Sequence, residues 1–443
     1  MTQVISLELN EVSFEFIETY INAGELPSFK RLLDKHGLIK TISEKEYPYL
    51  EPWIQWPTVY TGKDYAEHGI FRLGDAVNHD HVQIWDYLES KGLKVGAISP
   101  MNAVNRCKDA SFFLPDPWTE TTVTASKDVA HLYEVIKRLV NENASDRRSI
   151  AATARELLPL VMRHISLGST GEYLRVLRHA LRHKWARAAI LDRLLADLFL
   201  SLWNSSKPEF SSVFLNAAAH IQHHHMYDAA IYNGGRTNPA WYSTAANGII
   251  DPLLLIYRTY DSILKDFMAL KNTRLLITTG LSQYPNEREH YQYRMTSPLE
   301  TLAILGLEQC EIQLRMSRDF LLAFRTSEAA TQAMTTLAKT QCRGQDFFSI
   351  DNRGNTLFCQ IHYNGAPEGL TEVTHDGKVV NIADQIVLVS IENGLHRTLG
   401  YHVDCGISAA CANAMPPQPL STLFTKLCDL ALEANGKMKR DAA

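Results

Sequence analysis

The chain has 443 residues, of which 45% are hydrophobic and 21% charged, so it can form one large domain with insertions or two to three smaller ones. Glycine (23) and proline (17) occur at ordinary frequencies, which excludes collagen-like and low-complexity classes. A formal net charge of −5 is too small to predict a protein that coats nucleic acid, and we expect no nucleic-acid partner.

The N-terminal residues and the spacing of the cysteines predict the cellular compartment of the protein. The first ten residues lack the basic segment and the apolar run of a signal peptide, and the most apolar stretches are interrupted, so we expect neither a signal peptide nor a membrane span. The seven cysteines are odd in number and never spaced C-x-x-C, which argues against a disulfide framework and a zinc ribbon. The sequence therefore predicts a reducing, cytoplasmic location.

Short apolar runs alternate with amphipathic stretches along much of the chain, which is typical of an α/β fold. The predicted strands are Val4–Leu9, Lys94–Ser99, Phe210–Leu215 and Arg274–Thr279, and the predicted helices are Val12–Ala23, a second one from Pro27, and Gln83–Glu89. Strands of this kind belong to a mostly parallel sheet, whose ligands bind beyond the carboxyl ends of the strands. We therefore expect Asn10, Asn216 and the residues from Gly280 onward to matter for function.

Residues 118–205 carry no strand signal and predict a basic, all-helical insertion. Apolar residues recur at helical spacing through Leu132–Val140, Leu157–Ile165, Tyr173–Ala180 and Ala188–Leu202. Between Lys137 and Leu195 there are 12 Lys and Arg against 5 Asp and Glu. Arg175, Arg178 and Arg182 share one helical face, where they either clamp a phosphate-bearing ligand or form an ordinary solvated surface.

The last third of the chain predicts a small α+β subdomain at residues 311–379. Its predicted elements are strands at Phe320–Phe324, Phe347–Ile350 and Thr356–His362, with a helix at Ser327–Ala338. Gln385–Ile391 predicts a strand that returns to the main sheet, and Leu420–Ala434 a final helix before a frayed tail from Lys437. Residues 1–117, 206–310 and 380–443 then form the α/β core.

Four histidines follow the strand Phe210–Leu215 within a short segment, His220 and His223 to His225. His220 and His224 lie one helical turn apart and could share a metal ion. The alternative is that one or two of these rings pack and hydrogen-bond while the others face solvent. Without a further ligand motif, both interpretations stay open.

Two other segments hold candidate site residues. His396 and Arg397 lie between Gly394 and Gly400, which permit close approach of a ligand to the backbone, so His396 could bind a metal or an oxyanion and Arg397 a phosphate. The alternative is a tight turn with solvated side chains. Residues 46–70 are rich in aromatic residues and proline, and Trp53 and Trp56 either line a substrate pocket or belong to the core.

Five blocks of the chain resemble the alkaline phosphatase superfamily, closest to its type I phosphodiesterase and nucleotide pyrophosphatase branch. They occur in the family's order and are Leu9-Asn10-Glu11-Val12 with Gly24-Glu-Leu-Pro27 and Leu32-Leu33, Trp56 to Gly62 with His68-Gly69-Ile70, Asn216 to His220, Leu275 to Leu281, and His396 with Gly400. The resemblance implies a three-layer α/β sandwich with a mostly parallel central sheet. It also implies a site at which two metal ions and a Thr or Ser nucleophile act on a phosphate or sulfate ester.

The metal ligands of that family are largely replaced here. By the resemblance, Asn10 stands at the first aspartate, and the nucleophile position falls on Pro52 or, with one inserted residue, on Glu51. The Asp-His pair of the family has become Gly280-Leu281, which removes one metal site. At the other site Asn216, His220 and His396 remain, so we expect no metal or one weakly held zinc or manganese ion.

Two interpretations of this site remain. In the first, the pocket is repurposed for an anionic small-molecule or glycan-linked substrate, with His220 or His396 as general acid or base. The side chains that would surround the anionic group are Asn10, Gln55, Asn216, His220, Gln283 and His396. In the second, the chain is a catalytically inactive scaffold whose cleft binds a phosphorylated ligand or a partner protein.

Overall fold

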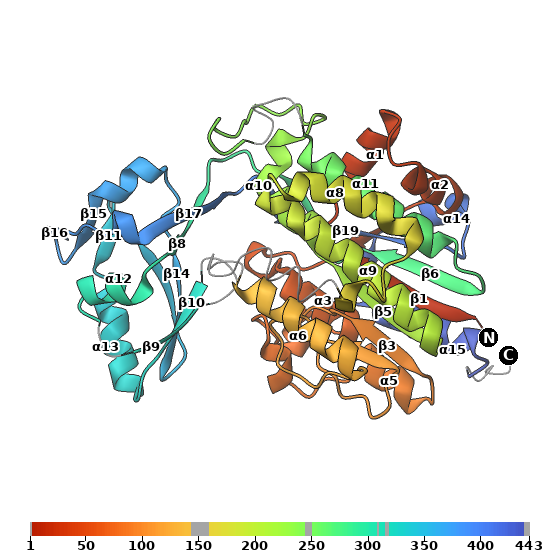
Figure 1. Cartoon of the computed structure of the whole chain (residues 1–443). Coiled ribbons are helices and arrows are strands. Elements are labelled where there is room, and N and C mark those ends of the chain that lie inside the picture. The colour runs from red at the N-terminus through yellow and green to blue at the C-terminus, as the bar shows by residue number, and fades with distance from the viewer. Residues whose placement is uncertain (1, 143–158, 244–249, 308–309, 315–318, 438–443) are drawn as a thin grey trace. The chain divides into compact units, whose positions relative to one another are not determined.

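The computed structural model describes residues 2–142, 159–243, 250–307, 310–314 and 319–437 (Figure 1). The chain divides into two compact units, residues 1–285 with 394–443 and residues 286–393. The predicted helix Leu157–Ile165 begins outside the described residues, and the tail beyond Lys437 lies outside them entirely.

A mostly parallel sheet forms the centre of the first unit. Its strands are β1 (Gln3–Leu9), β2 (Ile39–Ile42), β3 (Val95–Ile98), β4 (Phe112–Leu114), β5 (Phe210–Leu215), β6 (Thr273–Thr278), β19 (Leu399–Asp404) and β20 (Gln418–Pro419). Among the described residues the strand order is β20-β2-β19-β6-β1-β5-β3-β4, and β6, β1, β5, β3 and β4 run parallel. All four strands that the alternation predicts in this unit are present, and β1 lies in the middle of the parallel set.

Helices cover both faces of this sheet. They are α1 (Phe14–Asn22), α2 (Pro27–His36), α3 (Pro52–Thr61), α4 (Tyr65–His68), α5 (Ile84–Ser90), α6 (Lys127–Glu142), α8 (Thr170–Ala180), α9 (Arg187–Ser206), α10 (Ala217–His225), α11 (Pro252–Met268), α14 (Ala409–Asn413) and α15 (Thr422–Ala434). Figure 1 shows α9, α10 and α11 side by side, and their apolar side chains share one core with Ile5, Leu7 and Leu9. Helices α3, α5 and α15 share the other core with Val4. The fold is the expected α/β architecture of three layers.

The alternation of side chains along β1 explains why this strand contributes to the hydrophobic cores on both faces of the sheet. Successive residues of a strand point to opposite faces, so Ile5 and Leu7 meet α9 to α11 while Val4 meets α3 and α15. Ser6 and Glu8 occupy the same face as Val4. A carboxylate is thereby placed inside an otherwise apolar layer.

The second unit is a small α+β body, described here by itself. One antiparallel sheet has the order β13 (Phe348–Asn352), β14 (Thr356–Ile361), β10 (Asp319–Ala323), β9 (Glu311–Leu314), and another has the order β12 (Gln345–Asp346), β11 (Thr340–Cys342), β15 (Val373–His375), β16 (Lys378–Val379). Helices α12 (Pro298–Ile304) and α13 (Ser327–Leu337) complete it. Its core is separate from those of the first unit.

The predicted destination of the strand Gln385–Ile391 is wrong. This segment forms β17 (Ile386–Ile391), which pairs antiparallel with β8 (Tyr291–Met295) in the second unit and not with the main sheet. An apolar run predicts that a strand is buried, but it carries no information about which sheet the strand joins. The chain returns to the first unit only afterwards, through β18 (Gly394–Arg397), which pairs with β7 (Ser282–Pro285).

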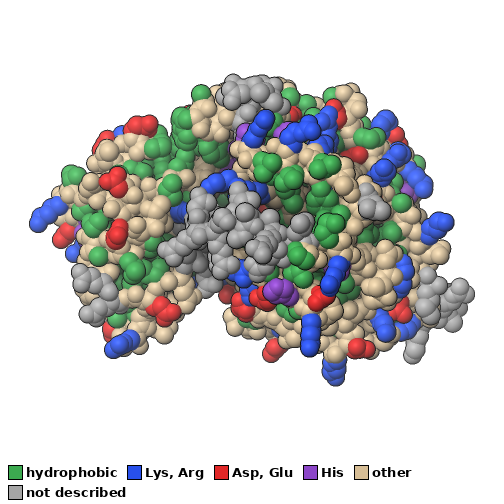
Figure 2. Space-filling model, viewed as in Figure 1, with side chains coloured by type: hydrophobic (Ala, Val, Ile, Leu, Met, Phe, Trp, Pro, Cys, Tyr) green, Lys and Arg blue, Asp and Glu red, His purple; other side chains and the backbone are tan. Residues whose placement is uncertain are grey.

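The surface carries both signs of charge interspersed with hydrophobic side chains on the face that Figure 2 shows. Arg175 is partly buried and pairs with Glu172 on α8, whereas Arg178 and Arg182 are exposed. None of the helices in the described part of the chain combines the length and apolar character that a membrane span requires. All seven cysteines lie in described segments and are free thiols.

Glu8 gives the first testable consequence. Its side chain is buried and accepts hydrogen bonds from Ser6 Oγ (3.1 Å) and Tyr60 Oη (2.7 Å). Burial raises the pKa of Glu8 from 4.5 to about 8, although the two hydrogen bonds act in the opposite direction. Between these values the folded protein binds a proton that the unfolded chain lacks, so the free energy of unfolding must fall as the pH rises.

We predict that Glu8→Gln removes this dependence. The wild-type protein should lose up to about 1.4 kcal/mol of stability per pH unit between pH 5 and 8 through Glu8, and the variant should be the more stable protein at pH 8. Urea denaturation of both proteins across this range measures the difference. Glu134→Gln, at an exposed position of α6, serves as the control and should leave the pH profile unchanged. Parallel profiles for Glu8→Gln and wild type would contradict the prediction.

Candidate functional site

Three neighbouring parallel strands end at the candidate site. Residues Asn10 and Glu11 follow β1, Asn216 follows β5, and Gly280 lies two residues beyond β6. The β7–β18 hairpin places Gln283 directly opposite His396. Because β5, β1 and β6 are adjacent and parallel, their carboxyl ends form one edge of the sheet, as expected for a ligand site in this fold class.

Glu11 has an unusual backbone at this edge. It is a non-glycine residue with φ +59°, a left-handed conformation that costs about 1 kcal/mol or more. Its N–H donates to the Thr279 carbonyl (3.0 Å), and its own carbonyl accepts from Gln222 Nε2 (2.8 Å). Tyr257 Oη in turn donates to Gln222 Oε1 (2.5 Å). The surrounding structure therefore holds Glu11 in a conformation that it would not adopt alone, which is typical of functional positions.

The side chain of Glu11 meets two histidines in an arrangement that we call the Glu11–His223–His396 triangle. Glu11 Oε2 lies 3.1 Å from His223 Nε2 and 2.9 Å from His396 Nε2, and the two Nε2 atoms lie 3.1 Å apart. Burial would raise the pKa of Glu11, but the charges and hydrogen bonds of His396 and His223 hold that pKa well below its ordinary value. Glu11 is thus an ionised carboxylate, although its side chain is only 2% exposed.

The other ring nitrogens face different partners. His223 Nδ1 lies 2.9 Å from the Gly394 carbonyl, which can only accept, so Nδ1 carries a proton and Nε2 is the ring atom that faces the triangle. His396 Nδ1 faces Glu51 Oε2 at 3.7 Å. Glu51 precedes α3 as its N-cap residue, and its side chain is 31% exposed.

Trp56 sets the orientation of the amides beside the triangle. Its indole N–H, which can only donate, bonds Asn10 Oδ1 (2.7 Å). Asn10 Nδ2 must then donate to Glu11 Oε1 (2.9 Å) and to Asn216 Oδ1 (2.8 Å). The Nδ2 group of Asn216 has no partner among the described residues, which leaves its two donors for a ligand. Trp56 is thus a buried core residue that also orients the side chain of Asn10 at the candidate site.

Helix α10 carries His223, and a buried carboxylate fixes its start. Asp192 accepts from the Ala217 N–H (2.7 Å) and from Tyr260 Oη (2.6 Å), at the helix end where backbone N–H groups lack partners. Burial raises the pKa of Asp192 to about 6, while these hydrogen bonds oppose the rise. The position of His223, two turns further along the helix, follows from this anchor.

Gln283 completes the surroundings of Glu11 at a cost. Its Nε2 donates to Glu11 Oε2 (2.5 Å) and to the Ala219 carbonyl (3.1 Å). Its Oε1 is buried with no partner among the described residues, which costs about 1 to 3 kcal/mol. A Cβ atom on Gly394 would lie 2.2 Å from that oxygen, so the close approach of β18 requires glycine.

Three of the residues that the sequence places at the site have other partners. Gln55 Nε2 donates to the Tyr49 carbonyl (2.7 Å), and Trp53 Nε1 donates to the Phe71 carbonyl (3.2 Å). Arg397 forms an ion pair with Glu15, and its Nε donates to Ser282 Oγ (2.8 Å). The positive charge that the sequence assigns to an anion is therefore already balanced by a carboxylate. Among the described residues, none of these contacts of Gln55, Trp53 or Arg397 reaches the triangle.

His220 lies outside the triangle. Its residue is exposed, and its ring centroid lies 4.5 Å from that of His224. Among the described residues, Glu11, His223 and His396 are the one group of three His, Cys, Asp or Glu side chains whose possible metal-ligand atoms all lie within 4.8 Å of one another. The structure therefore brings together His396, Asn10, Asn216 and Gln283 from the predicted set, and it adds Glu11 and His223. Two features of the sequence could have predicted these two residues. Glu11 directly follows Asn10, and His223 belongs to the segment of four histidines.

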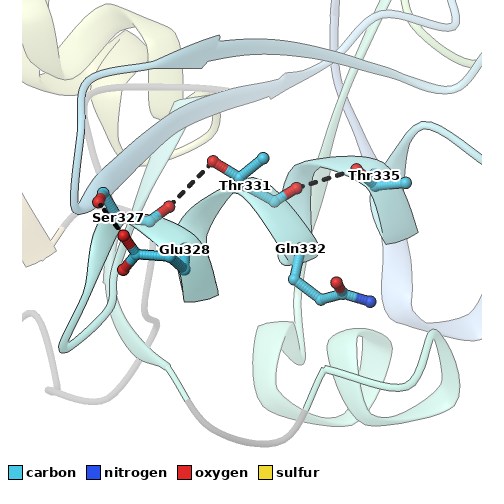
Figure 3. A pocket seen from close by; sticks show the side chains of 5 residues that line it. All are labelled: Ser327, Glu328, Thr331, Gln332 and Thr335. Carbon is cyan, nitrogen blue, oxygen red and sulfur yellow. Dashed lines mark hydrogen bonds between the residues drawn. The ribbon is translucent and has the colours of Figure 1, made fainter.

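A surface hollow on α13 in the second unit is a weaker candidate (Figure 3). Five exposed polar residues line it, Ser327, Glu328, Thr331, Gln332 and Thr335. The hydroxyls of Thr331 and Thr335 donate to carbonyls one turn earlier in the same helix, at 2.9 and 3.0 Å. This hollow holds no convergent or buried polar group, so the sheet edge in the first unit is the better candidate site.

Comparisons with known proteins give a distant structural likeness. No family model and no curated protein matches the sequence. One similar solved structure is phosphonoacetate hydrolase from Sinorhizobium meliloti 1021, with a TM-score of 0.45, 11% sequence identity, and coverage of 97% of this chain and 96% of that chain. Murine ectonucleotide pyrophosphatase/phosphodiesterase 5 has a TM-score of 0.42 and 10% identity, with coverage of 97% of this chain and 95% of that chain. The alkaline phosphatase of the Antarctic bacterium TAB5 has a TM-score of 0.40 and 10% identity, with coverage of 99% of both chains. We take the fold from the strand order above and not from these likenesses.

The amide at position 10 yields the second prediction. In Asn10→Asp an acceptor replaces the donor that faces Glu11 Oε1 and Asn216 Oδ1, so three oxygens meet without a hydrogen. We expect the free energy of unfolding to fall by about 1 to 3 kcal/mol or more in metal-free buffer at pH 7. Urea denaturation measures this. The control is Asn204→Asp at an exposed position of α9, where Oδ1 accepts from Lys207 Nζ and the change should stay within about 0.5 kcal/mol. Equal stability of both variants would contradict the prediction.

Proposed function

We propose that the chain is a divergent member of the alkaline phosphatase superfamily, close to its type I phosphodiesterase and nucleotide pyrophosphatase branch. It would hydrolyse or transfer a phosphate or sulfate ester group of an anionic small-molecule or glycan-linked substrate. The observation that carries this proposal is the convergence of one ionised carboxylate and two imidazoles at the carboxyl edge of the parallel strands. The blocks of sequence that resemble the superfamily fall on the end of β1, on α3, on the start of α10, on β6 and on β18.

Glu51 is our candidate for activating the nucleophile. By the resemblance the nucleophile position falls on Pro52 or, with one inserted residue, on Glu51, and Glu51 faces His396 from the N-terminus of α3. The nearby hydroxyls are engaged elsewhere, since Thr58 Oγ1 contacts the Ile54 carbonyl and Thr61 Oγ1 donates to the Pro57 carbonyl. In the simplest scheme the Glu51 carboxylate accepts a proton from water while that water forms a bond to phosphorus or sulfur. The ester bond to the leaving oxygen breaks, and a proton returns to that oxygen.

Binding of the substrate requires positive charge and donors at the same edge. Asn216 Nδ2 supplies donors, but Glu11 is ionised and Arg397 is paired with Glu15. An anionic ester would therefore meet net negative charge unless the imidazoles or a bound cation supply the balance. An inactive scaffold that binds a phosphorylated ligand would meet the same requirement, so only turnover distinguishes the two alternatives.

The third prediction tests the reaction. We expect turnover of at least one substrate in a panel of phosphodiesters, nucleotide sugars and sulfate esters, measured with the full chain as released phosphate, sulfate or alcohol. Glu51→Gln should lower the turnover number by at least about two orders of magnitude, the usual effect of losing a general base. The matched control is Glu46→Gln, an exposed glutamate in the loop before α3, which should keep wild-type turnover.

Two outcomes would contradict the proposal in different ways. If no member of the panel is turned over but one raises the melting temperature through binding, the alternative of an inactive binding scaffold is supported. If turnover occurs and Glu51→Gln retains it, the reaction stands but the role of Glu51 is wrong.

A further inference from the structure

The three contacts of the Glu11–His223–His396 triangle cannot all be hydrogen bonds. Two imidazole Nε2–H groups supply at most two linear hydrogen bonds, and the carboxylate oxygen supplies none. His223 Nδ1 already carries the proton that bonds the Gly394 carbonyl, so a neutral His223 has none at Nε2. Glu11 Oε2 also accepts from Gln283 Nε2. In every protonation state at least one of the three contacts therefore sets lone pair against lone pair or N–H against N–H, unless a metal ion lies among the three atoms.

The size of the triangle matches a set of metal ligands. Its edges measure 2.9, 3.1 and 3.1 Å. Tetrahedral coordination at about 2.0 to 2.1 Å separates neighbouring ligand atoms by about 3.3 Å. The three atoms are thus spaced nearly as one face of a zinc tetrahedron, and a small outward movement of the side chains suffices to accommodate the ion.

The groups around the triangle are those that orient metal ligands. A metal-bound histidine usually donates its second N–H to a carbonyl or carboxylate, and His223 Nδ1 meets the Gly394 carbonyl in this way. The free oxygen of Glu11 is held by Asn10 Nδ2. Trp56 Nε1 in turn donates to Asn10 Oδ1, and Gln222 Nε2 donates to the backbone carbonyl of Glu11. Such support costs backbone strain and an unsatisfied Gln283 oxygen, which a purely structural contact does not require.

We propose that Glu11, His223 and His396 bind a single divalent transition-metal ion, with Zn²⁺ preferred over Mn²⁺. Two nitrogens and one carboxylate oxygen suit zinc, whereas manganese prefers a shell richer in oxygen. Three protein ligands with the fourth position left to water or substrate are the arrangement of a catalytic zinc site. The ion would also supply the positive charge that an anionic substrate needs at this edge.

This ligand set differs from the one that the superfamily resemblance transfers to the chain. Of Asn216, His220 and His396, the triangle retains only His396. Glu11 replaces the anionic ligand that was lost when the aspartates became Asn10 and Asn216, and His223 replaces His220 one turn further along α10. The proposed metal site stands on its own geometry and does not require that the proposed reaction take place.

The fourth prediction tests metal binding directly. The full chain, stripped with a chelator and dialysed, should bind one Zn²⁺ per chain in calorimetric titration and elemental analysis. Co²⁺ in its place should give the intense visible absorption of a tetrahedral nitrogen and oxygen site. His223→Ala and Glu11→Gln should each weaken Zn²⁺ binding by at least about a hundredfold, more than the loss of an outer partner of a ligand does.

His220→Ala is the matched control, because His220 lies on the same helix and on the face predicted from the resemblance but outside the triangle. It should bind Zn²⁺ like the wild type. Circular dichroism of each variant establishes that it is folded, and His223→Ala, at a half-buried position, keeps the test decisive if Glu11→Gln does not fold. Zn²⁺ should also raise the melting temperature of the wild type but not of His223→Ala.

Three outcomes would overturn the proposal. A stoichiometry of zero would show that the triangle binds no metal, and a stoichiometry of two would require ligands outside it. Equal weakening by His220→Ala and His223→Ala would assign the binding to the histidine segment as a whole. None of these results depends on turnover, so failure of the substrate panel leaves the metal measurement intact, and the reverse also holds.

Discussion

The negative charge of a carboxylate that is almost inaccessible to water must be compensated by neighbouring groups, and Glu11 is such a carboxylate in the first unit. Isolated burial of such a charge would cost several kcal/mol. Asn10 Nδ2 donates to Oε1 and Gln283 Nε2 donates to Oε2, and the imidazoles of the two histidines also lie against Oε2. These residues come from segments far apart in the chain. The ionised state of Glu11 thus links the ends of three strands, one helix and one hairpin into a single arrangement.

The direction of each hydrogen bond in this arrangement follows from two groups that have no choice. The Trp56 indole can only donate, and the Gly394 carbonyl can only accept. The first fixes the amide of Asn10 and through it that of Asn216, and the second fixes the protonated nitrogen of His223. An aromatic core residue and a backbone carbonyl therefore determine which atoms the site presents. Loss of either hydrogen bond would change which donors and acceptors the site presents, although neither group has to contact a ligand.

Much of the fold could be predicted from local patterns, because burial imposes the period of side chains along each element. Phe210–Leu215 and the helix that starts at Pro27 are examples in which pattern and structure agree. The partner sheet of Ile386–Ile391 could not be predicted, since pairing depends on contacts distant in sequence. At the site, the ends of the strands pointed to Asn10 and Asn216. The roles of Glu11 and Arg397 depend on a left-handed backbone and on an ion pair with Glu15, and neither has a local signal.

The two connections between the units have a consequence for how this chain can vary. The chain leaves the first unit after Pro285 and re-enters it at Gly394, and these two residues are register partners in the β7–β18 hairpin. The Asn286 N–H also bonds the Asn393 carbonyl (2.7 Å), so the whole second unit occupies the place of a hairpin turn. Insertions, deletions or exchange of that unit can therefore accumulate while the pairing of Gln283 with His396 is kept. The unit that is open to such exchange begins and ends only a few residues from Gln283 and His396.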